Sequence, residues 1–207
     1  MKKSALNISK LEKGQLDDSV VIDLEFKRIT GVDISGRKID EFRAERCLFE
    51  EVALSQAEIA EGRVADCTFS KCNFAGVELN DFLFERSEFK SSWMQGMQTG
   101  GTPFRDCSFT ACKLNSANFR YAIFKDCVFD SCVLQESDFL GADLKNVDFI
   151  NCDLRESQFS QSSLKEVSFK GSQIEGMFLG QESLQEVTVD TAQAIYLASV
   201  FGLKVED

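Results

Sequence analysis

The sequence of 207 residues predicts an all-β solenoid, in which a short repeat coils around one long core. From Thr102 to Leu179 a large apolar residue (Phe, Leu or Ile) recurs every five residues, and a small or medium residue stands two positions before it. A period of five matches neither the 3.6 residues per turn of an α-helix nor the two-residue alternation of a strand. A short fixed period of this kind is typical of a solenoid.

Two residue types confirm that the period extends beyond this stretch. Fourteen of the nineteen phenylalanines, from Phe49 to Phe169, fall at the third position of the pentad. All eight cysteines fall at the first position: Cys47, Cys67, Cys72, Cys107, Cys112, Cys127, Cys132 and Cys152. Neighbouring cysteines in a column would lie about 4.8 Å apart, too far for a disulfide, so we expect small apolar core residues and neither metal nor redox chemistry.

A second period of twenty residues indicates how the chain coils. Similar segments begin at 104, 124, 144, 164 and 184, namely FRDCS, FKDCV, LKNVD, LKEVS and LQEVT. Four pentads therefore make one turn, which predicts a square coil with one pentad on each side. Successive coils are expected to stack about 4.8 Å apart through strand-like hydrogen bonds.

The repeat resembles a known family. Ala142-Asp143-Leu144-Lys145-Asn146, Ala117-Asn118-Phe119 and Cys152-Asp153-Leu154 fit the motif A(D/N)LXX of the pentapeptide repeat family. The resemblance covers residues 47–189 and implies a right-handed quadrilateral β-helix, with the first and third pentad positions pointing inward. It says little about function, because the family is defined by its core.

The ends and two irregular stretches divide the chain. Residues 1–21 do not fit the repeat and are expected to cap the open end of the β-helix, which would run over 22–189. Residues 22–46 are expected to form irregular first turns, since Lys27 and Arg37 would point inward. The glycine-rich stretch 91–103 carries loop signals, although the pentad phase continues across it.

Residues 190–207 are expected to form a short C-terminal α-helix and a tail. Asp190 can cap the helix and Gly202 can end it. The helix is apolar nearly all round, so one face can cover the last coil while another needs a second surface. We therefore expect a homodimer, with these residues in its interface: Ile195, Tyr196, Leu197, Val200 and Phe201. The tail is also similar to the end of the Qnr- and MfpA-type proteins, in which this helix joins two coils end to end.

Composition excludes several functional classes. The net charge of −11 argues against direct binding of nucleic acid. No apolar run is long enough for a transmembrane helix, and the first residues lack the apolar core of a secretory signal, so we expect a cytoplasmic protein without membrane contact. The sequence contains no histidine, no catalytic triad and no phosphate-binding motif. We expect neither enzymatic activity nor a cofactor.

The surface is the remaining place for function. The twenty-residue period stacks acidic residues in columns, and the candidate partner-binding residues are Glu41, Glu58, Glu61, Glu78, Asp81, Glu136, Asp138 and Asp153. These columns are either an ordinary solvated acidic surface or a mimic of the charge on DNA. Another side carries Arg105, Lys125, Lys145 and Lys165 beside acidic residues, as in a solvated ladder of ion pairs.

The Qnr and MfpA resemblance implies a partner for such a mimic. That partner would be a type II topoisomerase, DNA gyrase or topoisomerase IV, with protection from quinolones as one outcome. The alternative is a general protein-interaction scaffold with another partner. Trp93 is at an outward position, where we expect its indole to pack on a neighbouring side chain; in the scaffold alternative it would be a contact residue.

Overall fold

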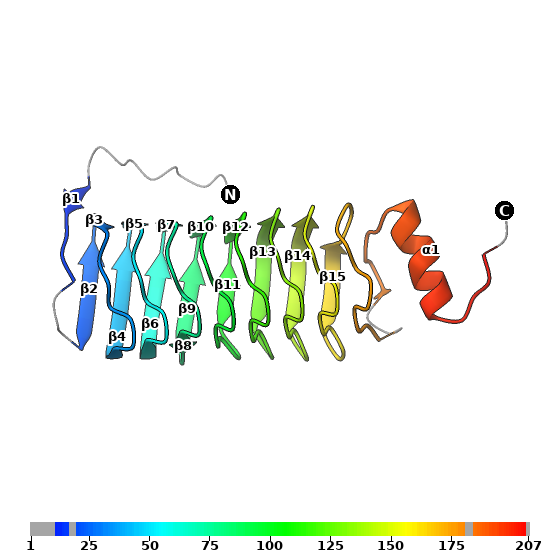
Figure 1. Cartoon of the computed structure of the whole chain (residues 1–207), viewed down its shortest axis with the longest axis horizontal. Helices are drawn as coiled ribbons and strands as arrows, with labels where there is room; N and C mark the ends of the chain where they lie inside the picture. Colours follow the sequence, from blue (N-terminus) through cyan, green and yellow to red (C-terminus); the bar gives the residue numbers. More distant parts are fainter. Residues whose placement is uncertain (1–10, 17–19, 181–183, 206–207) are drawn as a thin grey trace.

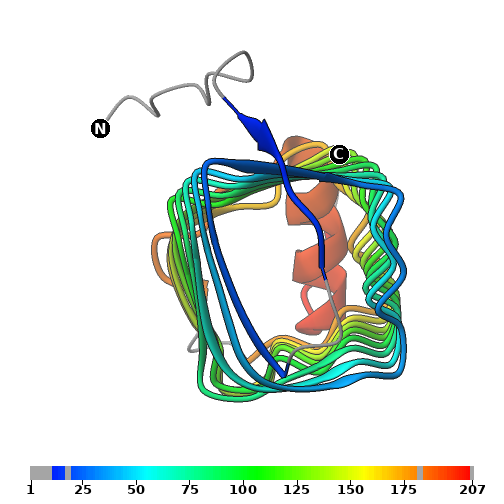
Figure 2. The same cartoon turned by 90° about the vertical axis from the view of Figure 1, so that its left-hand side faces the viewer.

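The computed structural model describes residues 11–16, 20–180 and 184–205. The chain forms a rod of stacked coils with one helix at its C-terminal end (Figure 1). Seen along the rod, the coils superimpose as a four-sided outline, and helix α1 crosses the far end (Figure 2). The predicted all-β solenoid with a short C-terminal helix is therefore confirmed.

Each coil takes twenty residues, because strands pair in parallel with partners twenty positions away, as Phe124 does with Leu144. We number the four sides by their central inward residues. Side 1 is centred on residues 24, 44 and so on to 164, and sides 2, 3 and 4 are centred five, ten and fifteen residues later.

The strands lie mainly on sides 1 and 2. Those that form side 1, some continuing around a corner, are β2 (Val21–Glu25), β4 (Lys38–Glu45), β6 (Glu58–Ala65), β9 (Phe82–Glu85), β11 (Pro103–Arg105), β13 (Ile123–Asp130), β14 (Asp143–Ile150) and β15 (Ser163–Ser168). Side 2 adds β3 (Lys27–Thr30), β5 (Leu48–Glu50), β7 (Thr68–Ser70), β10 (Glu88–Lys90) and β12 (Ser108–Thr110), with β1 (Glu12–Lys13) outside β3. Side 3 and most of side 4 are held by single bridges, apart from the two-residue strand β8 (Glu78–Leu79).

Stacked aromatic rings fill the interior. On side 2 consecutive phenylalanines lie nearly parallel, with ring centroids 4.5 Å apart for Phe109 and Phe129 and 5.3 Å apart for Phe149 and Phe169. All eight cysteines are buried and free, as the sequence predicts. Each buried phenylalanine contributes roughly 1.5–3 kcal/mol through the hydrophobic effect.

The stretch 91–103 is regular coil, so its loop signals do not mark a projecting loop. Trp93 bridges Asn73 and Lys113 in the coils on either side. Gly96 and Gly101 stand at corners with φ of 63° and 77°, where other coils place residues such as Gln56 at 57°. These glycines therefore occupy ordinary left-handed corner positions, which glycine adopts without strain.

The expected irregular first turns are also regular. Strand β2 pairs residue by residue with β4, from Val21 with Glu41 to Glu25 with Glu45. Lys27 stays half-buried at the end of the rod, where its ammonium group lies 2.5 Å from the carboxylate of Glu12, so its charge is not isolated. Most of the predicted N-terminal cap (1–21) lies outside the described residues, but β1 extends the sheet by one short strand.

Helix α1 (Thr191–Val200) closes the C-terminal end. Its N-cap is Asp190, whose side chain accepts from the backbone N–H of Gln193, while the Gln193 side chain accepts from the N–H of Asp190. Gln193 is buried and donates to the carbonyl oxygens of Phe169 and Ser172, both at 2.6 Å. The predicted cap is thus present, and Gly202 follows the helix with φ of 81°.

Candidate functional site

Five of the predicted acidic residues gather at the corner between sides 4 and 1. Glu41 lies opposite Glu61, and Glu58 lies opposite Glu78, in successive coils. Asp81 is next to the same group, because its carbonyl oxygen accepts from the N–H of Gly62 at 3.2 Å. We call these five residues, Glu41, Glu58, Glu61, Glu78 and Asp81, the acidic corner.

Two members of the acidic corner are neutralised by the protein itself. Glu41 forms an ion pair with Arg43, and Glu58 with Lys38 at 2.8 Å. Within the described part of the chain, Glu61, Glu78 and Asp81 have no cationic partner at ion-pair distance, and all three are exposed. These three carboxylates therefore remain available to a partner.

Sequence reasoning did not name Asp40, which is exposed on the same side of the first coil. Its place could have been read from the period, since it directly precedes Glu41. It adds a further carboxylate to the N-terminal end of side 4.

The other three predicted acidic residues do not join the corner. Asp138 lies on side 4 but beyond Gln98 and Asn118 in the bridge series, and its carboxylate is 2.6 Å from Arg120. Glu136 and Asp153 belong to side 3. The hydrogen bonds that Arg155 donates to Asp153 hold the pKa of this carboxyl below its ordinary value, so Asp153 stays charged but paired.

Trp93 projects from side 3, away from the acidic corner. Its side chain is 43% exposed, and its backbone is fixed between Asn73 and Lys113. It is available as a contact residue, but not as part of the same surface as Glu61 and Asp81.

The five residues predicted at a dimer interface divide between two surroundings. Tyr196 and Leu197 pack against the core of their own chain, and the Tyr196 hydroxyl accepts from the N–H of Gly176 at 2.7 Å. Phe201 is half-buried. Ile195 and Val200 are 48% and 53% exposed and add apolar surface at the end of the rod.

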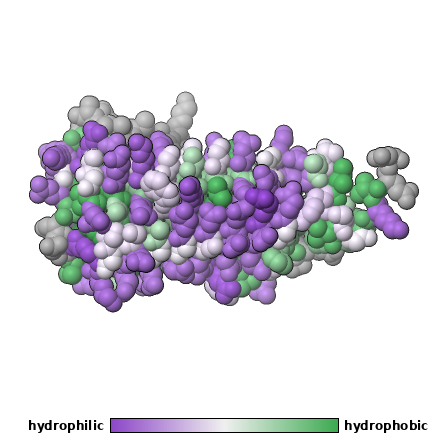
Figure 3. All heavy atoms as spheres, in the orientation of Figure 1, coloured by the Kyte–Doolittle hydropathy of each residue, from purple (hydrophilic) through white to green (hydrophobic). Residues whose placement is uncertain are grey.

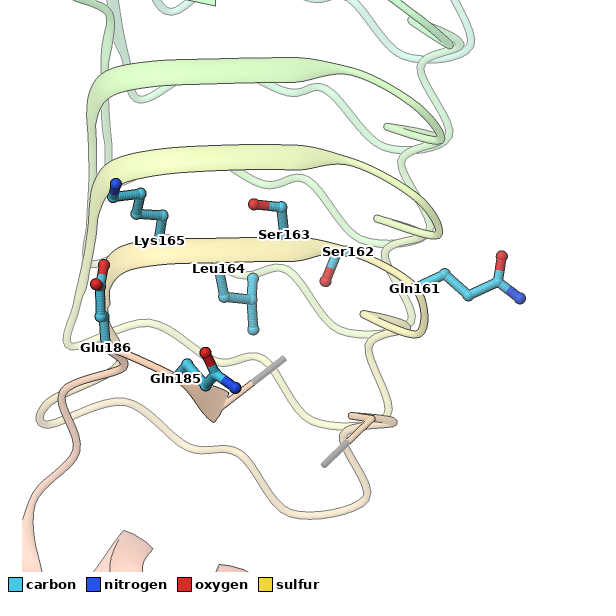
Figure 4. Close-up of a pocket in the computed structure, with 7 residues that line it drawn as sticks. All are labelled: Gln161, Ser162, Ser163, Leu164, Lys165, Gln185 and Glu186. Atoms are coloured by element: carbon cyan, nitrogen blue, oxygen red, sulfur yellow. The ribbon is translucent and has the colours of Figure 1, made fainter. Parts of the chain in front are cut away.

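A hollow near the last coil has a volume of about 400 Å³ (Figure 4). It is lined by Gln161, Ser162, Ser163, Leu164, Lys165, Gln185 and Glu186. Leu164 closes it from the core, while Lys165 and Glu186 stand on one side of it.

The residues that the structure describes contain neither a cluster of metal ligands nor a membrane-spanning helix. No group of three or more His, Cys, Asp or Glu side chains there is arranged to hold a metal ion. Within the same ranges, no helix is long and apolar enough to cross a membrane.

Comparison with known families identifies the repeat. A family model described as "Pentapeptide repeat region" matches residues 102–179, the stretch over which the sequence repeats most regularly. No curated protein matches the chain.

Solved structures with similar coils include full-length QnrB1, a plasmid-mediated fluoroquinolone resistance protein. It is 20% identical over 88% of this chain and 99% of its own, with a TM-score of 0.42. Another is HetL from the cyanobacterium Nostoc sp. strain PCC 7120, a pentapeptide repeat protein involved in heterocyst differentiation regulation. It is 14% identical over 81% of this chain and 86% of its own, with a TM-score of 0.32.

Proposed function

We propose that this chain, whose residues 102–179 match the pentapeptide repeat model, acts as a binding rod without catalytic activity. Its partner would be a type II topoisomerase, DNA gyrase or topoisomerase IV, which it engages as a mimic of DNA. The observation that carries this proposal is the acidic corner, where Glu61, Glu78 and Asp81 project unpaired from adjacent coils. The resemblance of the sequence to the Qnr and MfpA proteins supports the choice of partner.

The charge density of the corner is comparable with that of DNA. Its five carboxylates occupy three coils, which span about 10 Å at a coil spacing of about 4.8 Å. That is about one charge per 2 Å, or about one per 3 Å after Lys38 and Arg43 are subtracted, against about one per 1.7 Å for duplex DNA. A protein groove that accepts the phosphate backbone would therefore meet a similar field.

The rod holds these charges in fixed positions. Glu58 and Glu61 belong to β6, which pairs on both edges with β4 and with β8 or β9. A preorganised surface loses little conformational entropy on binding. In the described part of the rod no loop projects from the coil, so the proposed contact with the topoisomerase rests on the coil surface alone. Binding to the enzyme and protection from the drug are therefore measured separately.

The experiment is DNA supercoiling by gyrase, with purified protein titrated in and with or without a quinolone. We expect inhibition or drug protection at low micromolar protein. The double variant Glu61→Lys/Asp81→Lys should abolish the effect, because it turns two unpaired carboxylates of the corner into cations.

The control is Asp148→Lys/Glu156→Lys, which makes the same change of net charge on sides 2 and 3. Both control residues are exposed and lie outside the acidic corner. Equal loss of activity in the two variants would show that net charge, not the corner, governs the effect. No effect of the unmodified protein on gyrase or topoisomerase IV would overturn the choice of partner.

The alternative is a scaffold for another protein, which is favoured by the exposed indole of Trp93 on side 3. In that case Trp93→Ala would release a partner captured from cell extract, whereas Glu61→Lys/Asp81→Lys would not.

We also propose that the rod dimerises end to end through α1. Ile195 and Val200 are exposed there, and Phe178, Leu203 and Val205 add apolar surface nearby, each more than half exposed. Sedimentation of Ile195→Glu/Val200→Glu as a monomer, where the unmodified chain is a dimer, would support this contact. A monomeric unmodified protein at micromolar concentration would refute it.

A further inference from the structure

One column of outward side chains on side 1 changes sign halfway along the rod. It runs in register through every coil from β2 to β15: Glu25, Glu45, Ala65, Glu85, Arg105, Lys125, Lys145 and Lys165. Two members are largely covered, because Ala65 is buried and the Glu85 side chain is 15% exposed. The first half is acidic and the second half is basic. Side 1 faces the viewer in Figure 1, and Figure 3 shows the mainly polar surface of the rod in the same orientation.

Three of the four cations in the basic half have no ion-pair partner among the described residues, while Arg105 lies 3.8 Å from Glu85. Lys125, Lys145 and Lys165 are exposed, and none of them forms an ion pair with a residue that the structure describes. Like charges stacked one coil apart repel each other. An opposing row of carboxylates would remove that repulsion.

The acidic half offers such a row. The side chains of Glu25 and Glu45 are 58% and 43% exposed and share a single cation, Arg46. Glu85 is held by Arg63 at 2.6 Å and lies 3.8 Å from Arg105. Two glutamates with one cation between them leave a net negative charge at the N-terminal end of the column.

We propose that two copies of this chain associate side by side and antiparallel through side 1. A two-fold axis parallel to the strands, placed midway between Glu85 and Arg105, sets the column against its own reverse. The facing pairs are Glu25 with Lys165, Glu45 with Lys145, Ala65 with Lys125, and Glu85 with Arg105. Each pair occurs twice, as in any isologous contact.

The neighbouring outward column of side 1 fits the same arrangement. It reads Asp23, Arg43, Arg63, Leu83, Pro103, Ile123, Asp143 and Ser163. Reversed on itself, it places Arg43 opposite Asp143, and Leu83 opposite Pro103 beside the axis. Ile123, which is 40% exposed, then meets the aliphatic part of Arg63.

Neither column produces a like-charge pair in the antiparallel arrangement, whereas a parallel dimer, whose two-fold axis runs along the rod, would set one column against the other and bring Asp23 against Glu25. A third column, at the corner between sides 1 and 2, contains Asp66, Arg86, Asp106 and Asp126. The same axis places Arg86 of one copy against Asp106 of the other. It also places Asp66 against Asp126, but Asp66 is already bound by Arg86. Complementarity of this kind fixes register and orientation, and exposed ion pairs give moderate, salt-sensitive affinity.

The test uses the full chain carrying Ile195→Glu/Val200→Glu, so that contact through α1 does not contribute. Sedimentation equilibrium is measured at low and high salt. We expect a dimer at low salt that dissociates as salt is raised. Lys145→Glu alone and Glu45→Lys alone should each weaken the dimer by about tenfold or more, because each sets like charges face to face twice.

Mixing the two single variants tests directly whether residue 45 of one copy faces residue 145 of the other. A heterodimer of Lys145→Glu with Glu45→Lys has opposite charges at both contacts, so the mixture should regain the affinity of the parent. A zero-length carbodiimide cross-link between Glu45 and Lys145 should appear in the parent. These residues are five coils apart in one chain, about 24 Å, so that cross-link joins two copies.

Three results would overturn the proposal. The first is a parent that stays monomeric at low salt. The second is a mixture no tighter than the single variants. The third is a set of cross-links that lacks both Glu45–Lys145 and Glu25–Lys165.

Discussion

Arg86 donates a hydrogen bond to each carboxylate oxygen of Asp66, both at 2.8 Å, and so joins two adjacent coils at a corner. This bidentate geometry is the strongest that an arginine and a carboxylate adopt. The hydrogen bonds from Arg86 hold the pKa of Asp66 below its ordinary value.

The ion pair between Arg86 and Asp66 predicts that the folded protein loses stability in acid. A carboxyl with a lowered folded-state pKa contributes stability that is present above its unfolded pKa, near 3.9, and is lost as the pH falls through the folded value. Asp66→Asn should lower the free energy of unfolding by up to about 1 kcal/mol at neutral pH, since the pair is partly exposed.

Urea unfolding at several pH values measures this effect. The difference between Asp66→Asn and the parent should shrink as the pH falls below 4. Asp148→Asn, an exposed carboxylate without a cationic partner among the described residues, is the matched control and should be nearly neutral. A constant difference at all pH values would show that charge is not responsible.

Gly62 predicts a second stability effect. A Cβ atom there would lie 2.3 Å from a ring carbon of Phe82 and 2.5 Å from the carbonyl oxygen of Phe42. Gly62→Ala should therefore destabilise the rod by about 1–3 kcal/mol through overpacking. Thermal unfolding compares it with Gly100→Ala, where the nearest atom lies 3.6 Å from the added Cβ and little change is expected.

We expect the hydrogen bonds of Gln193 to hold helix α1 against the last coils. Gln193→Ala would leave the carbonyl oxygens of Phe169 and Ser172 without their buried donor, which costs about 1–3 kcal/mol. Amide hydrogen exchange should show α1 opening more often, with the coils before residue 160 unchanged. Ala194→Ser, on the exposed part of the helix, is the control. Equal exchange in all three proteins would mean that α1 is held by its apolar contacts alone.

The reactivity of the buried cysteines toward a thiol reagent should report whether the coils are open. Desolvation raises the pKa of Cys72 to about 11 from its ordinary 9.0, so in the folded rod this thiol is both shielded and protonated. Because thiolate is the reactive form, a thiol reagent should leave the native protein unmodified at pH 8 and modify all eight cysteines after denaturation. Fast labelling of Cys72 in the native protein, by mass spectrometry, would contradict the packed interior.

The side and coil of nearly every residue could be predicted from the period alone. Glu41, Glu61 and Asp81 share a corner because 20 divides their spacing. What the period does not contain is where a long side chain points. Arg43 turns toward Glu41, and Arg120 reaches Asp138, by choices of rotamer that no repeat dictates.

Residues 22–46, which were predicted to be irregular, and residues 91–103, which carried loop signals, are both regular coil for physical reasons. Lys27 was expected to disturb the first coil, but at the end of a rod a half-buried ammonium group still reaches Glu12. The glycines of 91–103 are loop signals in the sequence, yet Gly96 and Gly101 occupy left-handed corners of the coil. Gln193, in contrast, had a readable signal, because Asp190-Thr191-Ala192-Gln193 has the spacing of a capping box.

Because one side takes five residues and one coil takes twenty, the length of an insertion decides its effect on the surface. Twenty added residues lengthen the rod by about 4.8 Å and leave every later side chain on its own side. Five added residues rotate all later side chains by a quarter turn about the rod axis, while inward and outward positions stay the same. Such a change placed before Arg105 would carry the three lysines that follow it onto the adjacent side. Surface chemistry on this scaffold can thus be rearranged by duplication alone, without altering a single core residue.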